Sequence, residues 1–306
     1  NKNISPTHLA VIFDSARKTF RNEIYNDYKA NRGEPPEDLI PQFKIIKDSV
    51  KAFGIQSIEL SGYEADDIIA TYTNKAVQNN WKVSIVSSDK DLMQMVSKKV
   101  NLIDTMKNKI IGPKEVEEKF GVKPEQVVDV QALAGDSSDN VPGVSGVGEK
   151  TAVKLIKKYG SLDGALINAD QVSNKRARTG LQEGAKNARL SQDLVTIMLD
   201  VAIDSSLDDF ISAKMNNSLC IEKFHELEFQ AFVKQFQEEN SNPIEVTKDQ
   251  KKDYHIVLTL DQLDDLIINL KSSNLISLDL KTTSTNPSIA EIVGLSFSVS
   301  KNSAWY

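Results

Sequence analysis

The sequence predicts an α/β protein with a mostly parallel sheet flanked by helices, followed by a helical region and the start of a second α/β unit. Short apolar runs at residues 8–14 and 82–87 have the length and composition of buried parallel strands. Helical patterns lie between such runs, and this alternation is typical of a parallel sheet. After Asp136 the pattern is almost wholly helical, until strand patterns return at Asp253.

The elements follow in a regular order along the chain. Strands are expected at 8–14, 57–60, 82–87, 100–104, 255–258, 275–279 and 292–299. Helices are expected at 39–53, 62–77, 113–120, 124–135, 149–159, 218–239 and 261–270. We divide the chain into an α/β core (1–135), a helical region (136–240), a polar linker (241–252) and a partial second domain (253–306).

Composition excludes several classes of protein. The 306 residues contain one cysteine, Cys220, so neither an internal disulfide nor a cysteine metal cluster is possible, and we expect a reducing, cytoplasmic compartment. No apolar run is long enough to span a membrane. The net charge of −6 argues mildly against a simple nucleic-acid binder, but the placement of the basic residues matters more than their sum.

Acidic residues recur where the predicted strands end and in one later turn. In chain order they are Asp14, Glu64, Asp66, Asp67, Asp89, Asp91, Asp136 and Asp139. Functional groups of an open parallel sheet gather beyond the carboxyl ends of its strands, so we expect these carboxylates to meet. For any single acid, a helix cap or an exposed position is the simpler explanation. The recurrence at successive strand ends favours a shared site.

A cluster of carboxylates is unfavourable unless cations neutralise it. Mg²⁺ is the natural candidate, because it prefers carboxylate oxygens and keeps several waters. Two such ions about 4 Å apart could activate a water and stabilise both oxygens of a phosphodiester displacement. Asp67 fits this cluster least well, since neighbouring residues Asp66 and Asp67 cannot point the same way on a helix.

A glycine-rich turn, GVSGVGEKTA at residues 143–152, lies between two predicted helices. Its glycines permit a tight turn and a close approach of the backbone to a ligand. The amides at the start of the following helix suit a phosphate, and lysines line that helix. This pattern indicates a helix–hairpin–helix element that holds a DNA backbone without reading its sequence. A second basic stretch, residues 14–32, follows the first acid and could attract a phosphate.

Together these motifs resemble the 5′ nuclease domain of bacterial DNA polymerase I and its flap-endonuclease relatives. The matching stretches are VIFDSARKTFRNEIYNDYKANR, GYEADD, SSDKDL and LAGDSSDNVPGVSGVGEKTA, in the family's order and spacing. The resemblance covers about residues 8–240. It implies a metal-dependent 5′–3′ exonuclease and structure-specific flap endonuclease of this fold.

The resemblance also implies roles for individual residues. The eight acids named above would ligate or support two divalent ions, Mg²⁺ or Mn²⁺, with Asp66 also counted as catalytic. Lys29 and Arg32 would contact and polarise the scissile phosphate, and Arg21 would help to bind DNA. The duplex backbone would be held by Gly143, Gly146, Val147, Gly148, Glu149, Lys150 and Thr151. A potassium ion would bind the backbone carbonyls of Leu133, Ala134, Pro142, Val144 and Val147.

The implied reaction is hydrolysis at or near a 5′ end or flap, leaving a 5′ phosphate. The implied partners are DNA with 5′ flaps, nicks or RNA primers, met during replication and repair, and we expect a cytoplasmic monomer without membrane contact. The family has a further strand with a metal-binding aspartate before His8, so we expect this chain to be a fragment truncated at its N-terminus.

The last segment resembles the beginning of the 3′–5′ exonuclease domain that follows in the same polymerase. Where that family has Asp-x-Glu, this chain has Asp279-Leu280-Lys281, and a lysine cannot replace a carboxylate ligand. We therefore predict no 3′–5′ proofreading from this segment.

Two alternatives to a nuclease remain open from the sequence. The first is a catalytically inactive DNA-binding remnant of the same domain, which keeps the hairpin without the full set of acids. The second is an α/β phosphohydrolase that does not act on DNA, which the hairpin and its lysines disfavour.

Overall fold

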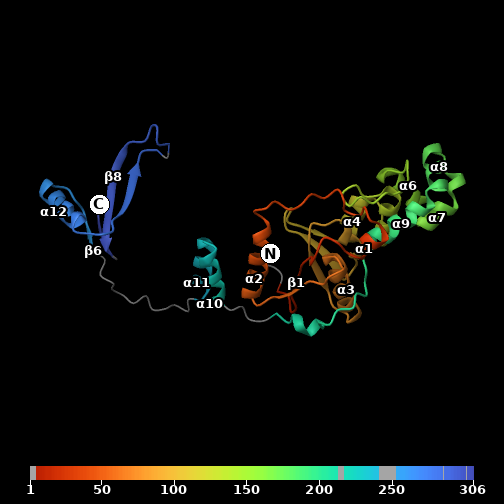
Figure 1. The fold of residues 1–306 in the computed structure, drawn as a ribbon, viewed down its shortest axis with the longest axis horizontal. Coiled ribbons are helices and arrows are strands. Elements are labelled where there is room, and N and C mark those ends of the chain that lie inside the picture. The colour runs from red at the N-terminus through yellow and green to blue at the C-terminus, as the bar shows by residue number, and fades with distance from the viewer. Residues whose placement is uncertain (1–4, 213–216, 241–252, 285, 301) are drawn as a thin grey trace. The chain divides into compact units, whose positions relative to one another are not determined.

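The computed structural model describes residues 5–212, 217–240, 253–284, 286–300 and 302–306 (Figure 1). The chain forms two compact units, Asn1–Phe236 and Gln237–Tyr306. The expected linker at residues 241–252 lies outside the described residues. Each unit is described by itself below.

The strands of the first unit form two small sheets in place of the single sheet that we expected. β1 (Ala10–Ile12) pairs in parallel with β2 (Gln56–Ile58). β3 (Val83–Val86) pairs in parallel with β4 (Val100–Asp104), and β4 pairs antiparallel with β5 (Lys109–Ile111). The α/β class and the parallel pairing are confirmed, and β5 is an addition that the sequence analysis missed.

Asp104 explains why the chain reverses after β4. Its carboxylate accepts hydrogen bonds from the backbone N–H groups of Met106 (3.0 Å) and Lys107 (3.1 Å). An aspartate that bonds the backbone two residues ahead forms a turn of its own. Asn108 completes the turn with φ +50°, a left-handed conformation that asparagine tolerates better than most residues. The apolar residues after it then return as β5.

Helices make up most of the rest of the first unit. They are α1 (Phe20–Ile24), α2 (Ile40–Ala52), α3 (Ala65–Gln78), α4 (Pro113–Phe120), α5 (Val127–Ala134), α6 (Glu149–Tyr159), α7 (Leu162–Ile167), α8 (Lys175–Glu183), α9 (Ala185–Val195), α10 (Asn217–Glu226) and α11 (Gln230–Asn240). The helix expected at 218–239 is two helices, because Glu228 adopts φ +58° between them. Left-handed residues of this kind commonly end helices.

One apolar core joins the strands to the helical region. It includes Leu102 of β4, Leu133 of α5 and Ile156 of α6, each fully buried. Burying a side chain of this size contributes about 1.5–3 kcal/mol. Helices α6 to α9 gather together in Figure 1, and α5 packs against α6, α7 and α9. The turn after α5 is therefore fixed relative to the strands, which matters because two acids of the candidate site lie in it.

The second unit is a four-stranded sheet with one helix. The strand order is β6 (Asp253–His255), β9 (Ser303–Trp305), β8 (Ile292–Ser300) and β7 (Ser277–Thr282), and the helix is α12 (Leu260–Lys271). The Nζ of Lys281 lies 3.3 Å from Oδ2 of Asp279, and both side chains are exposed. Among the helices in the described part of the chain, none is long and apolar enough to cross a membrane.

Candidate active site

Carboxylates from three segments line one small cavity in the first unit. Its acidic lining consists of Glu64, Asp66, Asp91, Asp136 and Asp139. The first two stand at the start of α3, and Asp91 begins the 3₁₀ helix η1 (Asp91–Met95) that follows β3. The last two lie in the turn after α5. The structure thus brings together five of the eight acids that the sequence placed at strand ends and in this turn.

Crowding changes the protonation of two of these acids. Burial raises the pKa of Asp66 to about 7, and repulsion from Asp89 and Glu64 adds to the effect. Burial also raises the pKa of Asp91 to about 6, against a hydrogen bond from Gln131 that lowers it. In that bond the Gln131 amide nitrogen lies 2.6 Å from Oδ1 of Asp91. Raised pKa values of this kind mark a place where additional positive charge would be stabilising.

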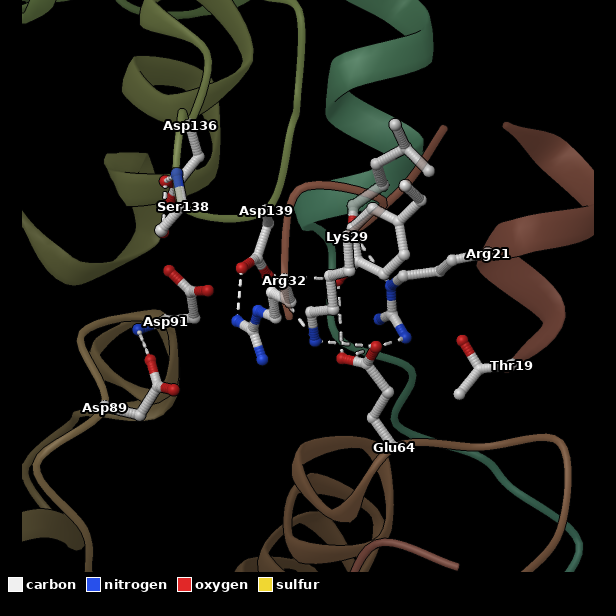
Figure 2. A network of polar contacts seen from close by, with 12 residues as sticks. Thr19, Arg21, Lys29, Arg32, Glu64, Asp89, Asp91, Asp136, Ser138 and Asp139 are labelled. Atoms are coloured by element: carbon white, nitrogen blue, oxygen red, sulfur yellow. Dashed lines mark hydrogen bonds and ion pairs between the residues drawn. The ribbon is translucent and has the colours of Figure 1, made fainter. Parts of the chain in front are cut away.

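Basic side chains neutralise the other three carboxylates, and Figure 2 shows those that lie beside Glu64 and Asp139. The Nζ of Lys29 lies 2.8 Å from Oε1 of Glu64 and 3.5 Å from Oδ2 of Asp139. Arg32 also pairs with Asp139. Lys90 places its Nζ 2.6 Å from Oδ2 of Asp136. The expectation that basic groups lie beside the acids is met at Lys29 and Arg32.

The sequence analysis missed Lys90, although its position between Asp89 and Asp91 was a signal. Burial alone would lower the pKa of Lys90, but the hydrogen bond and charge of Asp136 raise it above its ordinary value. Burial likewise tends to raise the pKa of Asp136, but bonds from Lys90 and Ser138 bring it below its ordinary value. Both groups therefore remain charged at neutral pH and form a true ion pair.

The sequence analysis also missed Tyr28, which is buried between two of the acids. Its hydroxyl lies 3.3 Å from Oδ2 of Asp139 and 3.4 Å from Oε2 of Glu64. Burial and the negative charge of Glu64 raise the pKa of Tyr28, so the hydroxyl keeps its proton and acts as a hydrogen-bond donor to these carboxylates. Tyr28 thereby helps to hold Glu64 and Asp139 near one another.

The cavity suits hard divalent cations, because its acidic lining residues offer carboxylate oxygens as metal ligands. Among the described residues, no three Asp, Glu, His or Cys side chains are grouped closely enough to hold a metal as they stand. Glu64, Asp136 and Asp139 are each turned to a protein cation instead. The residues fit a metal site whose ligands are held by ion pairs in this structure.

Three of the predicted acids lie outside this small cavity, and two of them, Asp14 and Asp89, are exposed. Asp14 is exposed, and its Oδ1 accepts a hydrogen bond from the backbone N–H of Ala65 (2.8 Å), so it caps the start of α3. Asp89 is also exposed, and its Oδ1 accepts from the N–H of Asp91 (2.9 Å). Asp89 still acts on the cavity through its charge, since it raises the pKa of Asp66.

Arg21 and Asp67 form a buried ion pair, which contradicts the roles predicted for both. Their side chains are 3% and 0% exposed, and both guanidinium NH₂ groups bond Asp67, at 2.7 and 2.8 Å. Arg21 also donates to the carbonyls of Leu194 and Thr196. Arg21 therefore has no surface to offer DNA, and Asp67 has no exposed oxygen for a metal. The pair fastens α1 and α3 to the end of α9 and to the segment after it.

A larger cavity of about 1000 Å³ adjoins the small one and shares Glu64 and Tyr28 with it. Basic and aromatic side chains from the stretch after β1 and from α2 line it, among them Arg17, Lys18, Lys29, Arg32, Phe13 and Phe43. Positive and aromatic groups together suit a nucleic-acid strand, because they meet both its phosphates and its bases. The cavity leads to the acidic cluster.

The hairpin adopts the geometry that its glycines require. Gly143 and Gly146 have φ of +62° and +79°, and Gly148 caps the start of α6. A Cβ on Gly180 of α8 would lie 2.0 Å from the carbonyl oxygen of Ser145, so α8 supports the hairpin from behind. The remaining predicted hairpin residues are placed as expected at the start of α6, namely Glu149, Lys150 and Thr151, with Val147 just before them.

The carbonyl groups predicted to bind potassium come from two neighbouring segments. Leu133 and Ala134 end α5, and the backbone N–H of Val144 donates to the Leu133 carbonyl at 2.8 Å. A Cβ on Gly135 would lie 3.0 Å from the carbonyl carbon of Pro142, so the two segments touch. The fifth residue, Val147, donates its N–H to the carbonyl of Val144 at 3.0 Å.

Comparisons with known proteins agree with this geometry. Residues 1–121 match the family model of the 5′-3′ exonuclease N-terminal resolvase-like domain, and residues 122–218 match the 5′-3′ exonuclease C-terminal SAM fold. A 5′-3′ exonuclease of Aquifex aeolicus is 40% identical over 230 residues, covering 75% of this chain and 78% of that protein. This chain belongs to the 5′-3′ exonuclease family.

Longer relatives and a solved structure extend the comparison. A DNA polymerase I of Rhizobium leguminosarum is 47% identical over 235 residues, which cover 77% of this chain and 23% of the polymerase. The chain spans about a quarter of the length of such polymerases. A phage T5 flap endonuclease, solved as a pseudo-enzyme–product complex with DNA and metal ions, has the same fold. Its TM-score is 0.54 at 21% identity, covering 75% of this chain and 81% of that one.

Proposed function

We propose that this chain hydrolyses phosphodiester bonds of DNA at 5′ ends and flaps with the help of two divalent ions, Mg²⁺ or Mn²⁺. The observation that carries the proposal is the cavity where five carboxylates meet beside Lys29 and Arg32. A structural ion-pair network would not require so many acids around one cavity, because each added carboxylate costs repulsion. Membership of the 5′-3′ exonuclease family supports the same activity.

The five carboxylates of the cavity would hold the ions, with Asp89 close by. The metal ions in the related T5 complex support this assignment. When bound, divalent ions supply activation of water and neutralisation of the charge on the reacting phosphate. Tyr28 keeps Glu64 and Asp139 in position through its hydroxyl. Gln131 does the same for Asp91.

Lys29 and Arg32 would bind the phosphate that is cut. Both face the larger cavity and both touch the acidic cluster, so they lie between the strand-binding surface and the metal ligands. Arginine offers a planar fork that matches a phosphate, and lysine offers a compact point charge. Cations placed where negative charge develops stabilise the transition state of phosphoryl transfer.

The hairpin at residues 143–151 would hold the backbone of the duplex next to the cut. Its glycines let the backbone approach a phosphate closely, and α6 presents its N-terminal amides there. The carbonyls of Leu133, Ala134, Pro142, Val144 and Val147 would hold a potassium ion, whose positive charge would attract a phosphate of the duplex. DNA in the T5 complex supports the choice of nucleic acid as the substrate.

The wider setting follows from the polymerase relatives. We propose that the chain is the 5′ nuclease part of a DNA polymerase I, acting in the cytoplasm on flaps, nicks and RNA primers during replication and repair. We also propose that it acts as a monomer, since the five carboxylates and their cations all come from one chain.

The test is a cleavage assay with a 5′-labelled flap duplex and Mg²⁺. The chain should release the flap, leaving a 5′ phosphate on the cut strand, and Asp66→Ala should not. Asp48→Ala is the matched control, because Asp48 pairs with Lys44 on α2 and lines neither cavity. DNA binding without Mg²⁺-dependent cleavage would favour the inactive DNA-binding remnant, and an absence of both would contradict the proposal entirely.

A further inference from the structure

Lys90 occupies a position in the acidic cluster that a metal ion would also favour. Its ammonium nitrogen lies 2.6 Å from Oδ2 of Asp136, whose side chain is 5% exposed. Asp136 uses its other oxygen to accept hydrogen bonds from the backbone and hydroxyl of Ser138. Within the described residues, Lys90 is therefore the cation that neutralises this buried carboxylate.

The same arrangement recurs at the other side of the cluster. Lys29 pairs with Glu64 and Asp139, and Arg32 pairs with Asp139 (Figure 2). The cavity between the carboxylates has a volume of only about 20 Å³. That is about the room that one water molecule needs. Two divalent ions with their waters can enter only if side chains move, and the three paired cations are the side chains that hold the carboxylates.

We propose that Lys90 is a tethered counter-cation of the metal site, which neutralises Asp136 until a divalent ion displaces it. The inference rests on the proposed metal-dependent function and adds a residue and a role to it. Lys90 is well suited to such an exchange, because its side chain is 43% exposed and leads from the cluster to solvent. A lysine ammonium on a flexible stem can leave without disturbing the backbone.

The exchange has a consequence for metal affinity that differs from the usual effect of a supporting residue. A residue that only positions a ligand weakens metal binding when it is removed. A competing cation does the opposite, because its removal leaves a carboxylate unpaired and takes away a positive charge that repels the ion. Removing one unit charge within a few ångströms of a divalent ion is expected to tighten binding by about tenfold.

The experiment measures Mn²⁺ binding by calorimetry, without DNA, in the whole chain. Lys90→Met should bind Mn²⁺ about tenfold more tightly than the unaltered protein, while Lys90→Arg, which keeps the charge, should restore the original affinity. Lys44→Met is the matched control, since it removes the same charge from an exposed pair with Asp48 on α2. Its affinity for Mn²⁺ should be unchanged.

Thermal unfolding keeps the test decisive if Lys90→Met is destabilised. In EDTA the variant leaves Asp136 buried and unpaired, so it should melt at a lower temperature than the unaltered protein. Saturating Mn²⁺ should then raise its melting temperature more than it raises that of the unaltered protein.

Equal or weaker Mn²⁺ binding by Lys90→Met would overturn the inference. If the unaltered protein still cuts flaps in that case, the proposed function stands and Lys90 is a positioning residue or a bystander. If neither protein binds Mn²⁺, both the inference and the metal-dependent function fall.

Discussion

At the scale of single residues, Asp66 is the acid whose pKa is raised most by burial and by repulsion from neighbouring carboxylates. Its pKa is about 7, raised by burial and by Asp89 and Glu64, whereas an unfolded chain would hold it near 3.8. Between these values the folded protein binds a proton that the unfolded chain releases. The contribution of Asp66 to the free energy of unfolding is therefore fully present below about pH 4 and is lost as the pH rises toward 7.

The substitution Asp66→Asn tests this protonation in EDTA. The variant should match the unaltered protein near pH 4 and exceed its free energy of unfolding by about 4 kcal/mol at pH 8, because the amide never ionises. Urea titrations at a series of pH values measure the difference. Parallel pH profiles for the two proteins would show that Asp66 does not titrate in this range.

Arg21 provides a second prediction at the same scale. Arg21→Met should lower the free energy of unfolding by about 3–5 kcal/mol, because it leaves Asp67 charged and fully buried. Adding Asp67→Leu should recover much of the loss, since a buried apolar pair often replaces a buried ion pair at little cost. Denaturant unfolding measures both variants. Unchanged stability with weaker DNA binding would restore the predicted DNA contact.

The sequence could place the acids near one another but could not say which way each one points. Asp66 and Asp67 are neighbours on a helix, so one faces the cavity and the other faces the core. That choice depends on Arg21, which lies 46 positions away from Asp67 and approaches it only in the fold. Tyr28 and Lys90 escaped notice for the same reason, because their partners come from other segments.

At the scale of elements, the hairpin depends on the helix behind it. Gly180→Val should push on the carbonyl of Ser145, since even a Cβ would lie 2.0 Å from that oxygen. We expect a stability loss of about 1–3 kcal/mol and at least about tenfold weaker binding of duplex DNA. Mn²⁺ binding should be retained, because none of the cavity acids lies on α8.

Fluorescence anisotropy with a labelled duplex measures the effect of Gly180→Val on binding. Thr179→Ala, an exposed and uncharged change on the same helix, is the control and should bind as the unaltered protein does. Unchanged duplex affinity in Gly180→Val would mean that the hairpin does not hold the backbone, or that α8 does not support it.

Elements with strong periodicity were predictable, and those fixed by single residues were not. Residues 113–120 and 149–159 form helices with the expected bounds, because capping positions and an apolar face mark them in the sequence. The strand β5 depends on the turn that Asp104 builds, and the break before α11 depends on one left-handed residue, Glu228. Neither signal stands out in a sequence where polar residues are common.

At the scale of the whole molecule, acidic and basic side chains gather on different surfaces. The net charge of −6 would repel DNA, yet basic side chains line the larger cavity and α6, while acids concentrate in the small cavity. An acidic protein can bind a nucleic acid when its basic groups are gathered on the surface that the strand meets. This arrangement was foreseeable in outline, because the acidic and basic stretches are separate in the sequence.

The division into two units gives the last prediction. Every acid and cation of the site, and the core beneath it, belongs to Asn1–Phe236. A chain that ends after Asn240 should therefore cut a 5′-flap duplex at the rate of the full chain, within about twofold. Calorimetric unfolding should show the same transition for the first unit in both proteins.

The control is Lys281→Glu in the full chain, which alters the exposed pair in β7 and should leave flap cleavage unchanged. A large loss of cleavage on shortening would mean that residues 241–306 take part in the site, and the assignment of the nuclease to the first unit alone would be wrong.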